Sequence, residues 1–209
     1  MNSKEIGQYK SKLKLSDIQR QVIVGLLLGD AHLETQNKGR TYRLKIEYSV
    51  KHSDYAMHIY ELFKEWILTP PRIKSDITHN NICFQTVSHA AFRFYAHQFY
   101  KDGKKSVPTK LIHKLLSPRS MAYWFMDDGS IKSRQSEGII LNTQCYGEKE
   151  VEFLAKTLKR LFGLKAEKRK QKKGWQIYIS GHSYETFRKI VDPYIETSMR
   201  YKIPSDRKT

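Results

Sequence analysis

Two apolar runs in this chain end in an acidic residue beside a small one. The first, VIVGLLLGDA, covers residues 22–31, and the second, MAYWFMDDG, covers residues 121–129. Both runs are long enough for a buried helix and too short for the ~18 residues that a membrane span needs. We therefore expect two apolar helices that carry Asp30 and Asp128 at their C-terminal ends.

Each of these helices has a start signal in the sequence. Ser16 and Gln19 match the capping-box pattern, in which each side chain bonds the other residue's backbone amide. Ser117 precedes Pro118, which places a good N-cap before a proline at the first helical position. The two helices are therefore predicted to begin near residues 17 and 118.

The segments that follow the two helices repeat the same order of patterns. Residues 41–49 alternate between polar and apolar positions, which is typical of a strand with one face in a core. Further strands are expected at residues 82–87, 138–144 and 175–180, and further helices at residues 53–68, 89–100, 148–164 and 182–195. Because hairpins are expected in both halves, we interpret the order as αββαββα, occurring twice. We predict an α+β protein with an N-terminal half, residues 1–105, and a C-terminal half, residues 106–209.

The repeat spacing also holds for charged residues. Asp30 and Asp128 are 98 residues apart, and Lys105 and Lys202 are 97 residues apart. Lysine is common in this chain, so a chance match is the alternative. Tandem duplication explains both spacings together and is the better interpretation.

The net charge indicates a polyanionic partner. The chain has 38 Lys and Arg against 21 Asp and Glu, a formal charge of +17. Such an excess destabilises a compact state by self-repulsion unless a partner compensates it, and nucleic acid is the leading candidate. No segment favours a membrane. The basic N-terminal stretch lacks the apolar core of a secretion signal, so we expect an intracellular protein that is not secreted.

The two matched acids suggest metal chemistry. Gly25 and Gly29 share a helix face, which allows close approach of a second helix and would bring Asp30 and Asp128 together. Two adjacent carboxylates repel unless a cation lies between them, and oxygen ligands favour Mg²⁺. A lysine near each acid would stabilise charge that develops on a phosphate, which makes Lys105 and Lys202 catalytic candidates.

The residues also resemble a known family. IVGLLLGDA and MAYWFMDDG are similar to the two LAGLIDADG motifs of homing endonucleases, and TYRLKIEY, WILTPPRIK, KKSVPTKL, ILNTQ and RYKIP extend the likeness over nearly the whole chain. The resemblance is to the single-chain, two-motif enzymes encoded in group I introns. It implies a pseudo-twofold monomer, with the motif helices at its interface and two antiparallel sheets that form a DNA-binding saddle.

The resemblance also implies roles for particular residues. Asp30 and Asp128 would bind the metal, with the backbone carbonyls of Gly29 and Asp127 as further ligands, and the lysine pair matches the family's basic active-site positions. Asp127 competes with Asp128 on sequence alone, and the motif alignment favours Asp128. The implied cofactor is Mg²⁺, with Mn²⁺ as a substitute and Ca²⁺ supporting binding without cleavage.

The sequence departs from the family motif at four positions. Leu28 and Met126 replace the first Asp of the motif, so that position is not expected to be catalytic. Ala31 and Tyr123 replace motif glycines. The second helix therefore lacks the glycine pair of the first.

Polar and basic residues on the expected strands and hairpins are candidates for DNA contact. Arg and Lys pair with guanine, and Gln and Asn pair with adenine. For each residue taken alone, a solvated surface position is an equal alternative. The candidates are Arg43, Lys45, Gln85, Asn142, Gln144, Gln176 and Tyr178, together with Lys168, Arg169, Lys170, Lys172 and Lys173, which are expected at a hairpin tip.

Three functions fit these observations. The first is a site-specific homing endonuclease that makes a staggered double-strand break by Mg²⁺-dependent hydrolysis. The second is an intron RNA maturase, and the third is a DNA-binding protein without cleavage activity. The presence of both acids and both lysines favours the endonuclease. Its partner would be double-stranded DNA, and its compartment an organelle matrix or a prokaryotic cytoplasm.

Overall fold

The structure is a computed structural model, and it describes residues 3–75, 80–133 and 136–204. The chain divides into two compact units. Unit 1 contains Met1–Arg20 and Asp30–His97, and unit 2 contains Gln21–Gly29 and Gln98–Thr209. The first apolar helix therefore packs mainly within unit 2. The predicted boundary between sequence halves at residue 105 concerns the repeat and stays a prediction.

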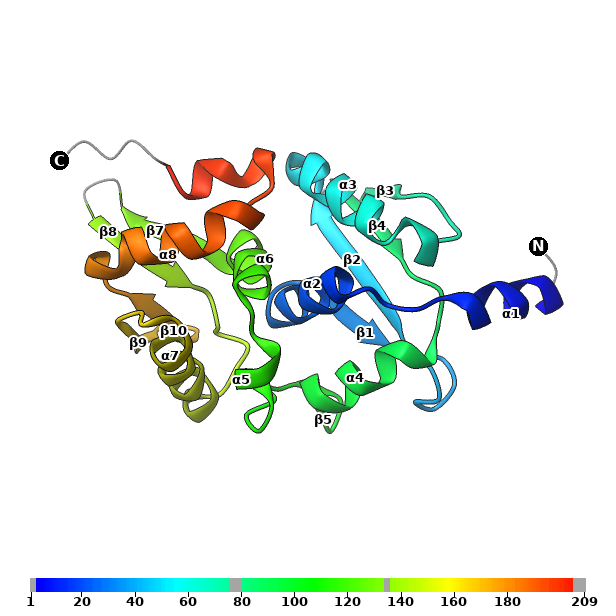
Figure 1. Ribbon diagram of the computed structural model, residues 1–209, viewed down its shortest axis with the longest axis horizontal. Coiled ribbons are helices and arrows are strands. Elements are labelled where there is room, and N and C mark those ends of the chain that lie inside the picture. Colours follow the sequence, from blue (N-terminus) through cyan, green and yellow to red (C-terminus); the bar gives the residue numbers. More distant parts are fainter. Residues whose placement is uncertain (1–2, 76–79, 134–135, 205–209) are drawn as a thin grey trace. The chain divides into compact units, whose positions relative to one another are not determined.

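The predicted αββαββα order is present twice, and the α+β class is confirmed (Figure 1). The first copy comprises α2 (Asp17–Leu28), β1 (His32–Glu34), β2 (Arg43–Ser49), α3 (Ser53–Leu62), β3 (Arg72–Ser75), β4 (Asn80–Gln85) and α4 (Arg93–Phe99). The second comprises α6 (Pro118–Asp128), β7 (Gly129–Ser133), β8 (Ser136–Leu141), α7 (Glu148–Phe162), β9 (Ala166–Gln171), β10 (Gly174–Ile179) and α8 (Tyr184–Val191). Outside the repeats lie α1 (Ser3–Lys12), β5 (Tyr100–Lys101), β6 (Lys104–Lys105) and α5 (Ile112–Leu115).

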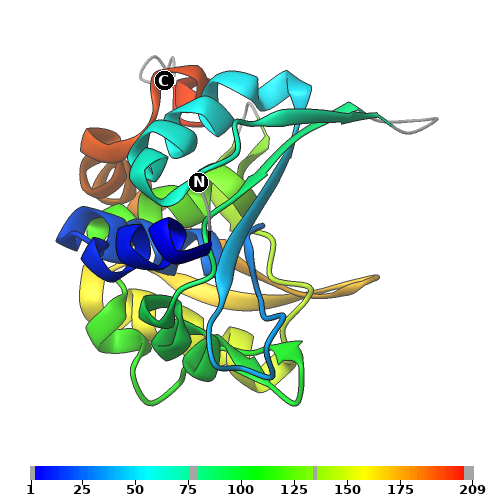
Figure 2. The same ribbon diagram turned by 90° about the vertical axis from the view of Figure 1, so that its right-hand side faces the viewer.

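Unit 1 is built on an antiparallel sheet with the strand order β1-β2-β4-β3. The predicted alternation holds in β2, where Leu44, Ile46 and Tyr48 are buried. Helix α3 packs against β2 and β4 on this apolar side (Figure 2). The opposite side of β2 carries Arg43 and Lys45. One face of the sheet is therefore core, and the other is polar and basic.

Unit 2 contains a second antiparallel sheet with the equivalent order β7-β8-β10-β9. Helix α7 packs across β9 and β10, and α8 packs against β8 (Figure 1). Ile177 and Ile179 of β10 are fully buried on the helix side. Lys172 and Lys173 form the two-residue connection between β9 and β10, as the hairpin pattern predicted.

Helices α2 and α6 pack closely within unit 2. A Cβ atom on Gly25 would lie 2.7 Å from Tyr123 Cβ, and one on Gly29 would lie 2.6 Å from Asp127 Cβ. Real side chains do not tolerate such distances, so Gly25 in α2 and Gly29 directly after it permit this approach. Both predicted start signals are present. Ser16 and Gln19 bond each other's amides at 3.0 and 3.2 Å, and Ser117 caps α6 before Pro118.

Some element boundaries differ from the prediction. The helix expected at residues 53–68 ends at Leu62 and is followed by a short 3-10 turn, Lys64–Trp66. The strand expected at residues 138–144 is β8, which ends at Leu141. Asn142 and Gln144 were predicted on that strand but lie in the connection that follows it. Within the described ranges, no helix has the length and apolarity required to cross a membrane.

Candidate functional site

Two lysines donate hydrogen bonds to the C-terminal ends of α2 and α6 in unit 2. The Lys202 ammonium contacts the carbonyls of Met126, at 2.5 Å, and Asp127, at 3.3 Å. The Lys105 ammonium contacts the carbonyl of Gly29. Gly29 and Asp127 are the residues that precede the two acids of the motifs, so each lysine reaches the same level of its helix. Both lysines are half-buried.

The end of α6 is also bonded by the connection after β8. The backbone N–H of Asn142 and its side-chain Nδ2 each donate to the Asp128 carbonyl at 3.0 Å. The Nε2 of Gln144 donates to the Asn142 side chain at 3.3 Å. Asp128 is half-buried. Asn142 thus acts on the backbone of the second motif, whereas the sequence suggested a strand residue that reads DNA.

The two motif acids have different environments. Asp30 is exposed and is the first residue of the second segment of unit 1, directly after Gly29. Gly29 is buried against Asp127, whose carboxylate side chain occupies the space that a Cβ on Gly29 would take. The structure therefore brings together Gly29 and Asp127, the two residues predicted to lend carbonyls to a metal.

The donors in this region fit a hard divalent cation. The possible metal ligands are all oxygen atoms. They are the carboxylate and carbonyl oxygens of Asp127 and Asp128 and the carbonyl oxygen of Gly29. In the described part of the chain, no three or more His, Cys, Asp or Glu side chains form a ready-made metal cage. Mg²⁺ suits such a sparse protein set, because it retains water and takes further ligands from phosphate. A site of this kind would be completed by water and by phosphate oxygens.

Tyr146 is a site residue that the sequence did not indicate. Its hydroxyl donates toward the carbonyls of Leu28, at 3.1 Å, and Leu27, at 3.3 Å. Glu150 was also missed. Its carboxylate accepts from the amides of Gly147, at 2.9 Å, and Val107, at 2.7 Å. A glycine followed three residues later by a glutamate is a helix-start pattern, and it was the available signal for Glu150.

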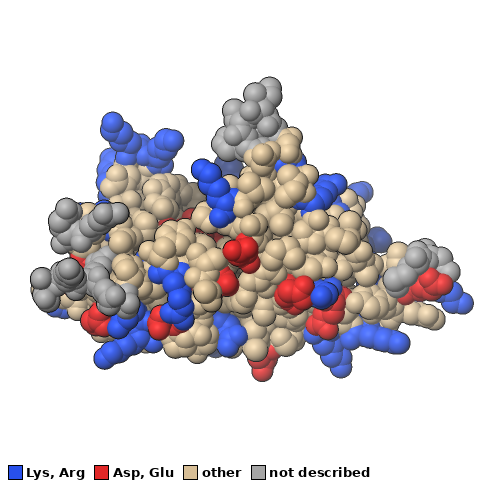
Figure 3. Space-filling model, turned by 90° about the horizontal axis from the view of Figure 1, so that it is seen from above, with Lys and Arg blue, Asp and Glu red and all other residues tan. Residues whose placement is uncertain are grey.

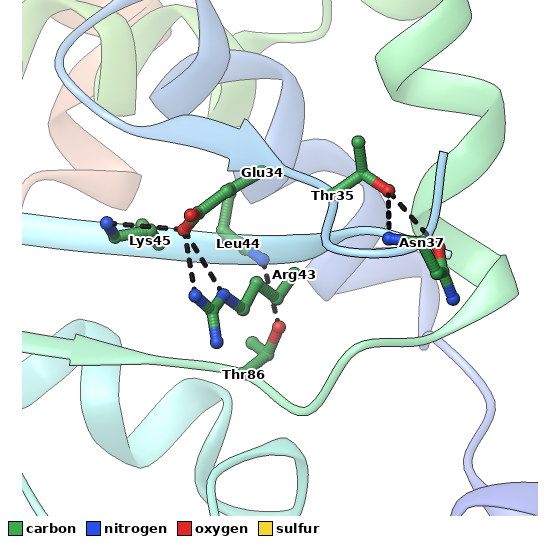
Figure 4. Close-up of polar contacts among 7 residues, drawn as sticks. All are labelled: Glu34, Thr35, Asn37, Arg43, Leu44, Lys45 and Thr86. Atoms are coloured by element: carbon green, nitrogen blue, oxygen red, sulfur yellow. Dashed lines mark hydrogen bonds and ion pairs between the residues drawn. The ribbon is translucent and has the colours of Figure 1, made fainter. Parts of the chain in front are cut away.

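The polar face of the sheet in unit 1 carries a small charged cluster around Glu34. Its carboxylate bonds Arg43, at 3.0 Å, and Lys45, at 3.3 Å (Figure 4). Hydrogen bonds from Arg43 and then Lys45 lower the pKa of the Glu34 carboxyl. Gln85 is exposed and pairs across the sheet with Lys45. These three DNA-contact candidates therefore share one face.

The polar face of the sheet in unit 2 holds a stacked pair. The Arg169 guanidinium lies 3.3 Å from the centre of the Tyr178 ring, and it forms an ion pair with Glu167 at 2.8 Å. The ring also lies close to Gly138, where a Cβ atom would be 2.4 Å from its Cε2 atom. Stacking orients Arg169 on this face. Lys172 and Lys173 are exposed at the hairpin tip, as predicted.

Other candidates are placed differently from the prediction. Lys168 lies within β9, and its side chain forms ion pairs with Glu148, at 2.6 Å, and Glu152, at 2.8 Å, on the helix-covered side. Arg169 and Lys170 also lie within β9 and not at its tip, and Lys170 shares the Lys168 side because it pairs with Trp175. Gln176 belongs to the polar face, but only 7% of its surface is exposed. The period-two alternation of a strand explains why Lys168 and Lys170 lie on the side opposite Arg169, because adjacent residues point to opposite faces.

Positive side chains are frequent on one face of the molecule. On the face drawn in Figure 3, lysine and arginine side chains protrude at many places, and acidic side chains occupy smaller areas. This distribution agrees with the charge of +17 and with a polyanionic partner.

Comparison with known proteins shows which family this chain is similar to. The LAGLIDADG DNA endonuclease family matches residues 20–187. A probable intron-encoded endonuclease of Wickerhamomyces canadensis is 33% identical over 97% of this chain and 91% of its own length. The cytochrome b mRNA maturase bI2 of Saccharomyces cerevisiae is 23% identical over 97% of this chain, which spans 50% of that protein.

Solved structures give the same result. The homing endonuclease I-WcaI bound to its DNA recognition sequence has a TM-score of 0.92 at 32% identity, covering 98% of this chain and 94% of that one. I-DmoI in complex with DNA and Mn has a TM-score of 0.53 at 13% identity, covering 82% of this chain and 94% of that one. The second likeness concerns the fold alone.

Proposed function

The chain belongs to the LAGLIDADG DNA endonuclease family, and we propose that it makes a staggered double-strand break at one long DNA site by Mg²⁺-dependent phosphodiester hydrolysis. The observation that carries the proposal is the pair of matched lysine contacts in unit 2. Lys105 and Lys202 each bond the carbonyl of the residue that precedes a motif acid. A scaffold used only for binding has no requirement for both.

Asp30 and Asp128 are the proposed metal-binding carboxylates, with the carbonyls of Gly29 and Asp127 as further ligands. A bound divalent cation supplies Lewis-acid stabilisation of the phosphoryl and leaving oxygens. The oxygen donors at the ends of α2 and α6 support this assignment. A carbonyl oxygen has two lone pairs, so accepting from a lysine leaves further acceptor capacity. Mn²⁺ is proposed to replace Mg²⁺, and Ca²⁺ to support binding without cleavage.

The proposed role of Lys105 and Lys202 is to stabilise negative charge on the phosphate in the transition state. Their hydrogen bonds hold each ammonium at the carbonyl of the residue before a motif acid, so little reorganisation would be needed when charge develops. One lysine per motif corresponds to one DNA strand per half-site. Two half-sites in one chain support action as a monomer.

The DNA-facing surfaces are proposed to be the polar faces of the two sheets. Arg43, Lys45 and Gln85 serve this role in unit 1, and Arg169, Tyr178, Lys172 and Lys173 serve it in unit 2. Asn142 and Gln144 act next to the second motif. The proposed compartment is intracellular, in an organelle matrix or a prokaryotic cytoplasm according to where the encoding intron resides.

A substitution at one acid tests the proposal directly. With a DNA target known to be cut, Asp128→Asn should abolish cleavage in Mg²⁺ and retain DNA binding in Ca²⁺. Glu185→Gln changes an exposed carboxylate on α8 and serves as the control for the loss of one negative charge. Cleavage by Asp128→Asn at the wild-type rate would remove this residue from the mechanism.

An intron RNA maturase is the second candidate, and the similarity to the cytochrome b mRNA maturase bI2 favours it. The discriminating experiment offers the protein its host intron RNA and the intronless DNA in parallel. Tight RNA binding without DNA cleavage would replace the endonuclease by the maturase. Salt-sensitive DNA binding without cleavage or RNA binding would favour a DNA-binding protein on the same scaffold.

A further inference from the structure

The connection between β8 and α7, residues 142–147, contacts the C-terminal ends of both motif helices in unit 2. Asn142 bonds the Asp128 carbonyl at the end of α6. Tyr146 bonds the Leu27 and Leu28 carbonyls at the end of α2. The connection belongs to the second copy of the repeat, yet it reaches the helix of the first copy. One short segment therefore acts on both motifs.

The Tyr146 contact completes the end of α2. The last carbonyls of a helix have no partner within the helix and need donors from elsewhere. The Tyr146 hydroxyl lies 3.1 Å from the Leu28 oxygen and 3.3 Å from the Leu27 oxygen, and only 4% of the residue is exposed. The next carbonyl, that of Gly29, accepts from Lys105. The backbone that leads into Asp30 is thus bonded at three successive residues.

The Tyr146 hydroxyl is the donor in these two contacts. Burial raises the pKa of its phenol far above the usual range, and the nearby Cys145 and Asp128 raise that pKa further. The hydroxyl is therefore protonated at neutral pH and can donate a hydrogen bond. An aromatic ring with one hydroxyl also has few rotatable bonds, which suits a residue that fixes a position.

The connection itself is held at both of its ends. The Thr143 hydroxyl donates to the Trp175 carbonyl of β10 at 2.9 Å. At the other end, Glu150 accepts from the amide of Gly147, and its second oxygen accepts from the amide of Val107. Val107 lies two residues after Lys105. The carboxylate of Glu150 thus joins the connection that carries Tyr146 to the segment that carries Lys105.

The connection at the corresponding place in the first copy has a different sequence. The corresponding connection from β2 to α3 is Val50–His52, a single 3-10 turn without a tyrosine. The two motifs are therefore supported differently, although their lysine contacts match. Removal of the Tyr146 contact should therefore affect the cleavage of the two DNA strands unequally.

We propose that Tyr146 is a positioning residue for the half-site that contains Asp30, fixing the end of α2 through the carbonyls of Leu27 and Leu28. The proposal rests on the endonuclease function. Tyr146 itself acts through backbone, so it is not a catalytic residue. Its loss should shift the Asp30 segment and slow the strand cut that depends on it, with less effect on the other strand.

The test compares Tyr146→Phe with Thr157→Val. The first removes only the hydroxyl. The control removes a buried hydroxyl that donates to the Phe153 carbonyl within α7, at 2.9 Å. On a target labelled at both strands, Tyr146→Phe should change the ratio of the two strand-cleavage rates about tenfold, since small misplacements are costly in catalysis. Thr157→Val should keep the wild-type ratio, and both variants should bind DNA in Ca²⁺ with wild-type affinity.

A second measurement does not depend on cleavage. Hydrogen exchange should become faster in residues 26–31 of Tyr146→Phe and remain at the wild-type rate there in Thr157→Val. Wild-type cleavage ratios together with wild-type exchange in residues 26–31 would overturn the proposal. Failure of the wild-type protein to cut any target would instead overturn the endonuclease function, and the exchange experiment would still decide whether Tyr146 holds the end of α2.

Discussion

Lys202 donates a hydrogen bond to the backbone carbonyl of Asp127 at 3.3 Å, and Asp127 directly precedes the second motif acid. Lys105 stands in the same relation to Gly29, which precedes the first. The two lysines are 97 residues apart and the two carbonyl residues are 98 residues apart. In the proposed mechanism, each half of the repeat would therefore supply one acid and one ammonium group.

Replacement of one lysine should produce a nicking enzyme. Lys202→Met keeps an unbranched side chain and removes the ammonium that bonds the end of α6. We expect one strand to be cut about 10²-fold more slowly, the cost of losing one preorganised donor. Lys105→Met should slow the opposite strand. The measurement is the accumulation of nicked circles from a supercoiled plasmid that carries the target. Equal slowing of both strands by each variant would contradict the assignment of one lysine to each half-site.

The packing of α2 against α6 predicts a large difference between two glycines. Gly25→Ala places a methyl group 2.7 Å from Tyr123 Cβ and should lower the free energy of unfolding by about 1–3 kcal/mol. Gly7→Ala in the exposed helix α1 has nothing within 4 Å of the new methyl group and should raise it by about 0.5–1 kcal/mol. Chemical denaturation of both variants checks the difference in sign. A neutral Gly25→Ala would show that the helices need no glycine at this level.

Two lysines near the same hairpin should differ in their effect on DNA binding. Lys173 is exposed at the tip, whereas Lys168 is engaged by Glu148 and Glu152 on the side covered by α7. Lys173→Ala should reduce the slope of log affinity against log salt by about 0.9, the value for one phosphate contact. Lys168→Ala should leave the slope unchanged. Titrations in Ca²⁺ at several salt concentrations measure both, and the reverse pattern would show that Lys168 contacts DNA.

The ion pairs of Glu34 predict a dependence of stability on pH. Arg43 and Lys45 hold the pKa of Glu34 below its usual value of 4.5. The stabilisation is therefore present above that pH and is lost as the pH falls through the lowered pKa of the folded state. Glu34→Gln should lose less stability than the wild type on acidification below pH 4.5. If the free energies of unfolding of the two proteins changed equally with pH across this range, the ion pairs of Glu34 would contribute nothing to stability.

Much of the fold followed from the sequence because it depends on local patterns. The alternation of Leu44, Ile46 and Tyr48 identified the face of β2 that is buried, and Ser117 with Pro118 identified the start of α6. Gly25 and Gly29 indicated the close approach of a second helix. Each of these features is set by neighbours a few residues away, so the sequence carries the information directly.

The candidate site was harder to predict from the sequence because it depends on contacts between residues far apart along the chain. Tyr146 bonds carbonyls 118 and 119 residues away, and nothing in its sequence neighbourhood marks it. Lys168 was assigned to a hairpin tip from its basic neighbours, although the alternation of β9 turns its side chain toward α7. The burial of Gln176 depends on packing within the sheet. Such placements require the tertiary structure.

The most direct test of the endonuclease is digestion of heterogeneous genomic DNA by the purified protein, in Mg²⁺ and separately in Ca²⁺, followed by sequencing of the new ends. We predict a few recurrent, staggered double-strand breaks in Mg²⁺ and none in Ca²⁺. Recurrent breaks would also give the target sequence. An absence of breaks in Mg²⁺, with salt-sensitive DNA or RNA binding intact, would contradict the endonuclease function and favour a binding role.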